Sequence, residues 1–334
     1  MKAIVYSRFG SPDVLELREV DQPKAGEGEI LVRVRAASVN PADWYLMMGA
    51  PWVARAQMGL RGPKTGRLGV DLAGVVEAVG GAVTRLRVGD EVFGAGAGTL
   101  AECVAVPEAS LVLKPAGLSF ELAAAVPVAA LTALQGLRDK GRVQPGQRVL
   151  INGASGGVGT FAVQLASSFG ADVTGVCSTR NVAMVRSLGA DQVVDYTQED
   201  FTRTGRRYDL LLDVAGGRSW PECVRVLDPQ AALVLVGAPK GNRLLGPVSH
   251  IAKLRLASLR ASQKAIFFIS KVSNEDLMAL RELLEEGTIR PVVERSYPLS
   301  EAADALRYLG EGHTRGKLVI TVTDRGAGLG HGGS

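Results

Sequence analysis

The chain has few of the residues that bind metals or form disulfides. Among its 334 residues there are three cysteines and three histidines, and the histidines all lie late in the chain. Cys103, Cys177 and Cys223 are far apart, with neither the CxxC spacing of redox and zinc motifs nor that of a disulfide framework. The sequence therefore predicts no disulfides and no metal site, and we expect a reducing, cytoplasmic location.

Blocks of like charge and apolar runs long enough to span a bilayer are also missing. The net charge is only +4, with lysine and arginine scattered, so we expect no nucleic-acid partner. The alanine-rich stretch Leu122–Leu137 is too short to span a membrane and contains Pro127, so we expect no membrane partner. A hydrophobic content of 46% indicates sizeable cores, and the length suggests two domains.

A glycine-rich turn is the most informative feature that is present. The apolar run Val149–Ile151 leads into GASGGVG at Gly153–Gly159, followed by an apolar helix and a second strand, Asp172–Cys177. This order predicts a βαβ unit in which a dinucleotide pyrophosphate lies against the helix N-terminus. The alternative is a glycine turn without a cofactor, which is disfavoured because the strand and helix that the fingerprint requires are both there.

The end of the second strand indicates which dinucleotide is bound. Sites that prefer NAD place Asp or Glu there, whereas this chain reads Cys177-Ser178-Thr179-Arg180-Asn181. The planar guanidinium of Arg180 suits a 2′-phosphate, and Ser178 and Asn181 can add neutral donors. The alternative is that Arg180 only begins a solvated helix, Val182–Leu188. We favour NADPH as the cofactor.

Two patterns divide the chain. The N-terminal third predicts short strands, such as the alternating Ile30–Ala36, and from Ser119 helices and strands alternate, which predicts a doubly wound parallel sheet. Asn274 is the expected N-cap of a later helix. The predicted boundaries are 1–120 for the first domain, 121–288 for the dinucleotide-binding domain, 289–323 for a return to the first, and 324–334 for a disordered glycine-rich tail.

Several blocks carry a family resemblance. They are AASVNPADW (Ala36–Trp44), GVDLAGVVEAVG (Gly69–Gly80), GDEVFG (Gly89–Gly94), VPVAALTALQGL (Val126–Leu137), GASGGVG (Gly153–Gly159), LGADQVVDY (Leu188–Tyr196) and GKLVI (Gly316–Ile320). In this order the chain resembles the medium-chain dehydrogenase/reductase superfamily, specifically its zinc-free quinone oxidoreductase-like branch. The resemblance implies an α/β protein with a GroES-like β catalytic domain, an inserted NADPH-binding Rossmann domain, and a cofactor cleft between them.

Departures from the zinc-dependent relatives bear on the chemistry. Those relatives have a cysteine where this chain has Asn40, and a His-Glu pair where it has Val70-Asp71; they also carry a four-cysteine lobe that is missing here. The resemblance therefore implies a metal-free site, in which NADPH supplies hydride and hydrogen bonds stabilise the acceptor oxygen. Asn40 is the candidate donor, because it replaces a metal ligand; the alternative is only a turn role before Pro41.

Tyr45 is the candidate proton donor, and the alternative is a half-buried packing role. Thioester-reducing relatives place their tyrosine further on, where this chain has Pro51-Trp52. The stretch 52–67 is expected to cover the mouth of the active site, or else to be a solvated loop.

The resemblance also implies a set of cofactor contacts. They are Thr132, Gly153, Ser155, Gly156, Gly157, Val158, Ser178, Arg180, Tyr196, Val236, Gly237 and Lys317. Lys317 is expected to approach the cofactor phosphates, and the alternative is an ordinary surface role.

The function predicted from these residues is NADPH-dependent, zinc-independent hydride transfer to a quinone or an α,β-unsaturated carbonyl. Two alternatives remain open: an enoyl or enone reductase of one pathway, with thioesters among its candidate substrates, and an NADPH-binding regulatory or structural protein with little turnover. A small-molecule substrate and a homodimer are expected, with the apolar strand Ala265–Ile269 as the dimer seam. The sequence does not identify the substrate.

Overall fold

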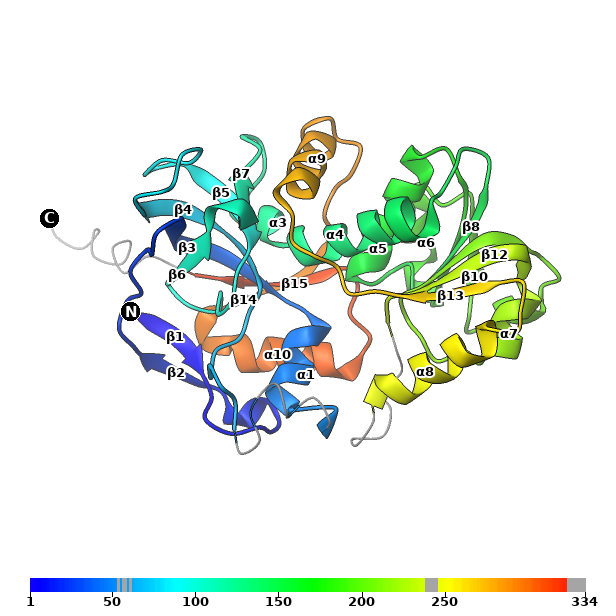
Figure 1. The fold of residues 1–334 in the computed structure, drawn as a ribbon, viewed down its shortest axis with the longest axis horizontal. Coiled ribbons are helices and arrows are strands. Elements are labelled where there is room, and N and C mark those ends of the chain that lie inside the picture. The colour runs from blue at the N-terminus through cyan, green and yellow to red at the C-terminus, as the bar shows by residue number, and fades with distance from the viewer. Residues whose placement is uncertain (53–54, 56–58, 60–61, 238–245, 323–334) are drawn as a thin grey trace, which may run out of the picture.

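The computed structural model describes the chain apart from residues 53–54, 56–58, 60–61, 238–245 and 323–334 (Figure 1). The predicted tail and much of the predicted lid at 52–67 lie outside the described residues. Two large sheets lie side by side, with helices α4 (Pro127–Gln135) and α5 (Gly157–Ser168) between them. None of the described helices combines the length and the hydrophobicity needed to cross a bilayer.

The first large sheet is built from both ends of the chain. Its order is β14-β15-β3-β4-β5-β7, and β6 pairs with β3. The strands are β3 (Glu29–Val39), β4 (Asp71–Val79), β5 (Glu91–Ala95), β6 (Cys103–Pro107), β7 (Leu111–Leu113), β14 (Val293–Pro298) and β15 (Lys317–Thr321). The first half of β3 pairs with β6 and its second half with β15, so that Val39 lies opposite Leu318. A small sheet of β1 (Lys2–Val5) and β2 (Glu16–Glu19) lies beside it.

The second large sheet is parallel throughout and has the order β10-β9-β8-β11-β12-β13. Its strands are β8 (Arg148–Asn152), β9 (Asp172–Cys177), β10 (Gln192–Asp195), β11 (Tyr208–Asp213), β12 (Leu227–Leu235) and β13 (Lys264–Phe267). The chain reverses direction across the sheet at β8, the first strand, as in doubly wound folds. The predicted fold class, a GroES-like domain with a Rossmann domain, is confirmed.

The helices follow the predicted alternation, with two differences. They are α1 (Pro41–Met48), α3 (Phe120–Ala124), α6 (Val182–Ser187), α7 (Trp220–Arg225), α8 (Gly246–Ser258), α9 (Asn274–Glu285) and α10 (Ala302–Glu311), besides α4 and α5. The sequence analysis predicts no helix at α8. The N-cap of α9 is Ser273, whose hydroxyl accepts from Asp276 N at 3.1 Å, so the expectation for Asn274 is wrong. The Asn274 side chain instead donates to the Leu111 carbonyl on β7.

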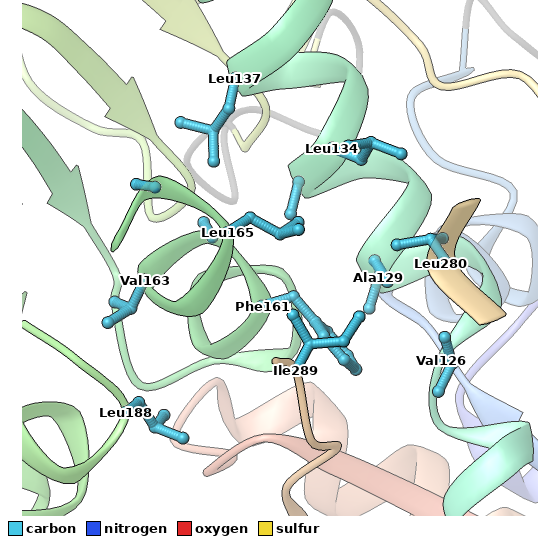
Figure 2. Packing of buried hydrophobic residues seen from close by; sticks show 14 of the residues in the cluster. Val126, Ala129, Leu134, Leu137, Phe161, Val163, Leu165, Leu188, Leu280 and Ile289 are labelled. Carbon is cyan, nitrogen blue, oxygen red and sulfur yellow. The ribbon is translucent and has the colours of Figure 1, made fainter. Parts of the chain in front are cut away.

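One hydrophobic core joins the two sheets. Figure 2 shows residues of this cluster on three helices, with Leu134 on α4, Phe161 and Leu165 on α5 and Leu280 on α9, and with Leu137 just after α4. These side chains belong to one cluster with residues of the first sheet, among them Ala36, Phe93 and Val319. Each fully buried Phe or Leu side chain contributes roughly 1.5–3 kcal/mol to folding. The two domains therefore share a packed boundary, and the glycine turn is held at that boundary.

Candidate active site

The predicted glycine turn lies between β8 and α5, where it forms the N-terminus of the helix. Gly156 is the N-cap and has no side chain with which to cap α5, so the positive end of this helix carries no side-chain cap. Gly153 has a φ of +87°. A Cβ at Gly159 would lie 2.1 Å from the Gly153 carbonyl oxygen. The fold itself therefore requires glycine at positions 153 and 159.

Gly156 differs from these two glycines. A Cβ built there would meet its first neighbour at 3.6 Å, an ordinary contact, and the φ of −82° suits any residue. The fold alone does not explain a glycine at this position. A phosphate that approaches the half-buried helix N-terminus would explain it, because a Cβ would fill the space it needs.

The beginning of β15 is attached to this turn. Gly316 N donates to the Ser155 carbonyl at 2.8 Å, and Gly156 and Gly316 form a parallel bridge. A Cβ at Gly157 would lie 2.9 Å from Cδ of Lys317, so the lysine side chain runs past the first residue of α5. Lys317 therefore begins beside the predicted pyrophosphate site.

The Lys317 side chain ends in a buried polar cluster with Asn40 and Asp71. Nζ of Lys317 lies 2.6 Å from Asn40 Oδ1 and 3.0 Å from Asp71 Oδ2. Asn40 Nδ2 donates to the same Asp71 oxygen at 2.9 Å, and Ser38 Oγ donates to it at 2.7 Å. The lysine side chain and the asparagine are each 4% exposed, and Asp71 is fully buried. The ammonium group of Lys317, paired with the Asp71 carboxylate, thus lies beside Asn40, the predicted catalytic residue.

Asn40 is held in place by its backbone as well as its side chain. It is the N-cap of α1, and its backbone N–H donates to Asp43 Oδ2 at 2.8 Å. The other carboxylate oxygen of Asp43 accepts from Gly69 N at 3.0 Å. Burial raises the pKa of Asp43 to about 6, although both backbone hydrogen bonds oppose that shift. Asp43 therefore fixes the end of the helix that presents Asn40.

Tyr45 also lies on α1, but the described contacts do not connect it to the cluster. Its ring packs edge-on against Trp44, with centroids 5.4 Å apart. Partial burial raises the pKa of the Tyr45 hydroxyl, which makes it a weaker acid. The structure brings Asn40 and Lys317 together, and among its described contacts it shows Tyr45 only in a packing role.

Thr132 is connected to the same cluster through α4. Its hydroxyl donates to the Val128 carbonyl at 2.6 Å, and Val128 N donates to Asp71 Oδ1 at 2.9 Å. Thr132 Oγ1 also lies 2.8 Å from Ser270 Oγ, just after β13. Ser270 was missed by the sequence analysis, because no motif marks a serine that follows an edge strand.

The predicted 2′-phosphate residues lie at the end of β9. The Arg180 side chain is exposed, and its Nη2 donates to the His313 carbonyl. Tyr196 is 51% exposed, and its backbone N–H donates to the Cys177 carbonyl at 3.0 Å. Ser178 directly follows the strand. These three residues therefore gather at one corner of the parallel sheet.

A carboxylate from the neighbouring strand also lies at this corner. Thr179 Oγ1 donates to Asp195 Oδ2 at 2.5 Å, and this hydrogen bond holds the pKa of Asp195 below its ordinary value. Asp195 is not among the residues predicted from the sequence, because the cofactor motif at the end of β9 does not include residues of the neighbouring strand. The signal was available, because parallel pairing of β10 with β9 places Asp195 opposite Cys177.

Val236 and Gly237 follow β12 at the same edge. Their backbone N–H groups donate to the Asp213 carbonyl at 3.0 and 3.1 Å, and a Cβ at Gly237 would lie 1.8 Å from the Val214 carbonyl oxygen. The Asp213 side chain, also missed from the sequence, accepts from Asn152 Nδ2 at 2.7 Å through Oδ1. Among the described residues its Oδ2 is buried and has no hydrogen-bond partner, and burial raises the pKa of this carboxyl group. Within the described part of the chain, this oxygen is therefore an unsatisfied acceptor beside the glycine turn.

Comparison with known proteins identifies the family. The description "Alcohol dehydrogenase GroES-like domain" matches residues 26–116, and "Zinc-binding dehydrogenase" matches residues 188–320. The 2-methylene-furan-3-one reductase of Solanum lycopersicum is 35% identical over 96% of this chain and 79% of its own length. The chloroplastic NADPH-dependent alkenal/one oxidoreductase of Arabidopsis thaliana is 34% identical, with the same coverage. The quinone oxidoreductase of Coxiella burnetii superposes with a TM-score of 0.84 at 33% identity, over 97% of this chain and 99% of that one.

The chain belongs to the medium-chain dehydrogenase/reductase superfamily, in its quinone oxidoreductase-like branch. This protein is therefore an oxidoreductase. One of the two matching family descriptions refers to zinc. Within the described part of the chain, no group of three or more His, Cys, Asp or Glu side chains could hold a metal ion.

A cavity of about 460 Å³ lies away from the glycine turn, at the amino-terminal edge of the parallel sheet, where Arg148, Asp172 and Gln192 line it.

Proposed function

We propose that this oxidoreductase transfers hydride from NADPH to a conjugated carbonyl, either a quinone or an α,β-unsaturated ketone or aldehyde, without a metal. The observation that carries the proposal is the meeting of the glycine turn with Asn40, Asp71 and Lys317. The printed names of the three relatives refer to a quinone, an enone and alkenals, which share a conjugated carbonyl group.

The turn fits a dinucleotide. Gly157 and Val158 at the positive end of α5 would lie against the pyrophosphate, and the space beside Gly156, whose own N–H donates to the Gly153 carbonyl at 3.2 Å, suits a phosphate. Arg180, Ser178 and Tyr196 would hold the adenosine 2′-phosphate, and Thr132, Val236 and Gly237 would lie near the nicotinamide end. Arg180 supports NADPH over NADH because its guanidinium matches a phosphate, whereas Asp195 at the same corner works against it.

When bound, NADPH supplies the hydride. The contribution of this chain is to stabilise the negative charge that develops on the acceptor oxygen. The Asn40 carboxamide can donate a hydrogen bond there, and the Lys317 ammonium is bonded to the carbonyl oxygen of that amide in a buried setting. In this proposal, the pair provides the electrostatic stabilisation that a zinc ion provides in other branches.

The experiment is NADPH and NADH oxidation by purified, chelator-treated protein with 1,4-benzoquinone, 9,10-phenanthrenequinone and a simple enone as acceptors. We expect turnover that prefers NADPH and survives chelation. Loss of activity on chelation, with recovery on adding zinc, would contradict the metal-free mechanism. NADPH binding without reduction of any acceptor would contradict the proposed activity.

A homodimer formed through β13 is also part of this proposal. β13 ends the parallel sheet, so one of its edges has no partner strand among the described residues. Leu256 and Leu259 near the end of α8 are 70% and 77% exposed, and Ile269 after β13 is 79% exposed. Apolar residues gathered at a sheet edge support pairing with a second copy.

A further inference from the structure

The orientation of the Asn40 carboxamide follows from the charges on either side of it. An ammonium can only donate hydrogen bonds and a carboxylate can only accept them. Asn40 Oδ1 therefore faces Lys317 Nζ at 2.6 Å, and Nδ2 faces Asp71 Oδ2 at 2.9 Å. The flipped amide would place N–H groups against the ammonium and a carbonyl oxygen against the carboxylate, so both contacts would become repulsive.

This orientation leaves a defined donor. The Asn40 amide has two N–H bonds, and the described hydrogen bonds use one of them, to Asp71. The backbone N–H of the same residue is already bonded to Asp43. The second amide N–H is therefore the group that the proposed reaction can use, and its direction is fixed by the two contacts above.

Lys317 is itself held from both ends. Its backbone N–H donates to the Val292 carbonyl at 2.8 Å, and its side chain passes the first residue of α5 before reaching Asn40. Asp71, which neutralises it, keeps three other hydrogen bonds, from Ser38, Asn40 and Val128 N. The ammonium thus has little freedom, and loss of it would not leave the carboxylate without partners.

We propose that Lys317 is a positioning residue, which sets the Asn40 carboxamide so that its second N–H donates to the oxygen of the conjugated carbonyl. This inference rests on the proposed function and assigns Lys317 a role other than contact with the cofactor phosphates. Without the ammonium, only the Nδ2 hydrogen bond to Asp71 still orients the Asn40 amide, so the direction of its second N–H is less well fixed.

The test uses Lys317→Met, which keeps the length of the side chain and removes the charge. We expect kcat with 1,4-benzoquinone to fall roughly 10- to 100-fold. Removing an oxyanion donor itself lowers kcat by about 100- to 1,000-fold, and here the donor remains but is less well oriented. The NADPH Kd should change less than about threefold, because the glycine turn is intact. Lys317→Gln, which restores a neutral donor, should recover part of kcat, and it also serves as the probe if the methionine variant does not fold.

A double-variant cycle separates positioning from an independent role. If Lys317 acts through Asn40, adding Lys317→Met to Asn40→Ala should lower kcat no further. Additive losses of kcat would overturn the inference. Weaker NADPH binding with an unchanged kcat would also overturn it, because it would mean that Lys317 contacts the cofactor phosphates. Lys114→Met is the matched control, because the Lys114 side chain is also 4% exposed and ion-paired, with Glu91 at 3.0 Å. This control should leave kcat unchanged.

A second measurement needs no turnover. In protein labelled with [15N]asparagine, the side-chain amide signals of Asn40, identified by their loss in Asn40→Ala, should exchange slowly with solvent. Lys317→Met should accelerate that exchange at least about tenfold, while Lys114→Met should not. If the wild type reduces no acceptor, the proposed function fails but this readout still tests the positioning. Unchanged exchange in Lys317→Met would overturn the inference even in an active enzyme.

Discussion

Gly159 lies directly against the carbonyl oxygen of Gly153, so close that a Cβ at position 159 would be 2.1 Å from that oxygen. Gly156 in the same turn has no such neighbour. The two glycines therefore separate the requirements of folding from those of ligand binding.

We expect Gly156→Ala to fold with an unchanged Tm and to bind NADPH roughly tenfold or more weakly, because the new Cβ would occupy the phosphate space. Gly159→Ala should cost at least about 2 kcal/mol of unfolding free energy, because backbone must move to admit the methyl group. Thermal unfolding and fluorescence titration measure the two effects. Gly117→Ala, where a Cβ meets nothing within 4 Å, is the control and should change neither. Normal NADPH binding by Gly156→Ala would contradict the placement of the pyrophosphate.

Arg180 offers a test of cofactor choice. Because a charge-assisted hydrogen bond is worth about 1.5–3 kcal/mol, Arg180→Ala should weaken NADPH binding roughly 10- to 100-fold. NADH lacks the 2′-phosphate, so its Kd should change little. Isothermal titration with both cofactors checks this prediction, and Arg203→Ala, at a side chain that is 77% exposed, is the control. Equal losses for the two cofactors would show that Arg180 does not bind the 2′-phosphate.

Asp43 should make stability depend on pH. Its pKa is raised by burial from 3.8 to about 6, so the folded state binds the proton more tightly than the unfolded state does. This contribution to stability is present in full below pH 3.8 and is lost as the pH rises through about 6. A shift of about two pKa units corresponds to about 3 kcal/mol.

The Asp43→Asn variant lacks this titration and isolates the effect. Between about pH 4 and pH 7, the unfolding free energy of the wild type should fall relative to that of the variant by up to about 3 kcal/mol. Urea unfolding at several pH values measures the difference, in which other titrating groups cancel. A difference that is constant, or that grows with pH, would mean that the hydrogen bonds from Asn40 and Gly69 keep Asp43 readily ionised.

Ile269 tests the proposed dimer. Replacing it with aspartate puts a charge at the end of the apolar edge strand, so Ile269→Asp should convert a dimer into a monomer at micromolar concentration. Sedimentation velocity measures the change. Val88→Asp alters another exposed apolar residue, 63% exposed and near β5, and should leave the dimer intact. A wild type that sediments as a monomer would disprove the dimer altogether.

Local patterns allowed most of the elements to be predicted. The alternation in Ile30–Ala36 indicates β3, and the glycine cluster indicates the turn before α5, because both signals lie within a few residues. Helix α8 was not predicted, although Pro247 stands near its start, where proline is favoured in a helix. Short-range signals of this kind do not reveal how distant segments meet.

The contacts within the candidate site also join distant segments, which short-range signals do not reveal. Asn40 and Lys317 were each singled out, one as a donor and the other as a phosphate contact, but their hydrogen bond joins residues 277 positions apart. It depends on the register that places Leu318 opposite Val39, which no local pattern specifies. Asp195 was missed for a similar reason, because its neighbour at the edge of the sheet is on another strand.

The position of β15 also determines when, during synthesis of the chain, the pairing with β3 and the polar cluster can form. The second half of β3 pairs with β15, yet 277 residues separate Asn40 from Lys317. At about 5–20 residues per second, a ribosome takes on the order of 15 to 60 seconds to make that stretch. Until β15 is made, the second half of the nascent β3 lacks this one of its neighbouring strands, and Asp71 lacks the ammonium that pairs with it. Synthesis of β15 is therefore needed both for this pairing and for the polar cluster.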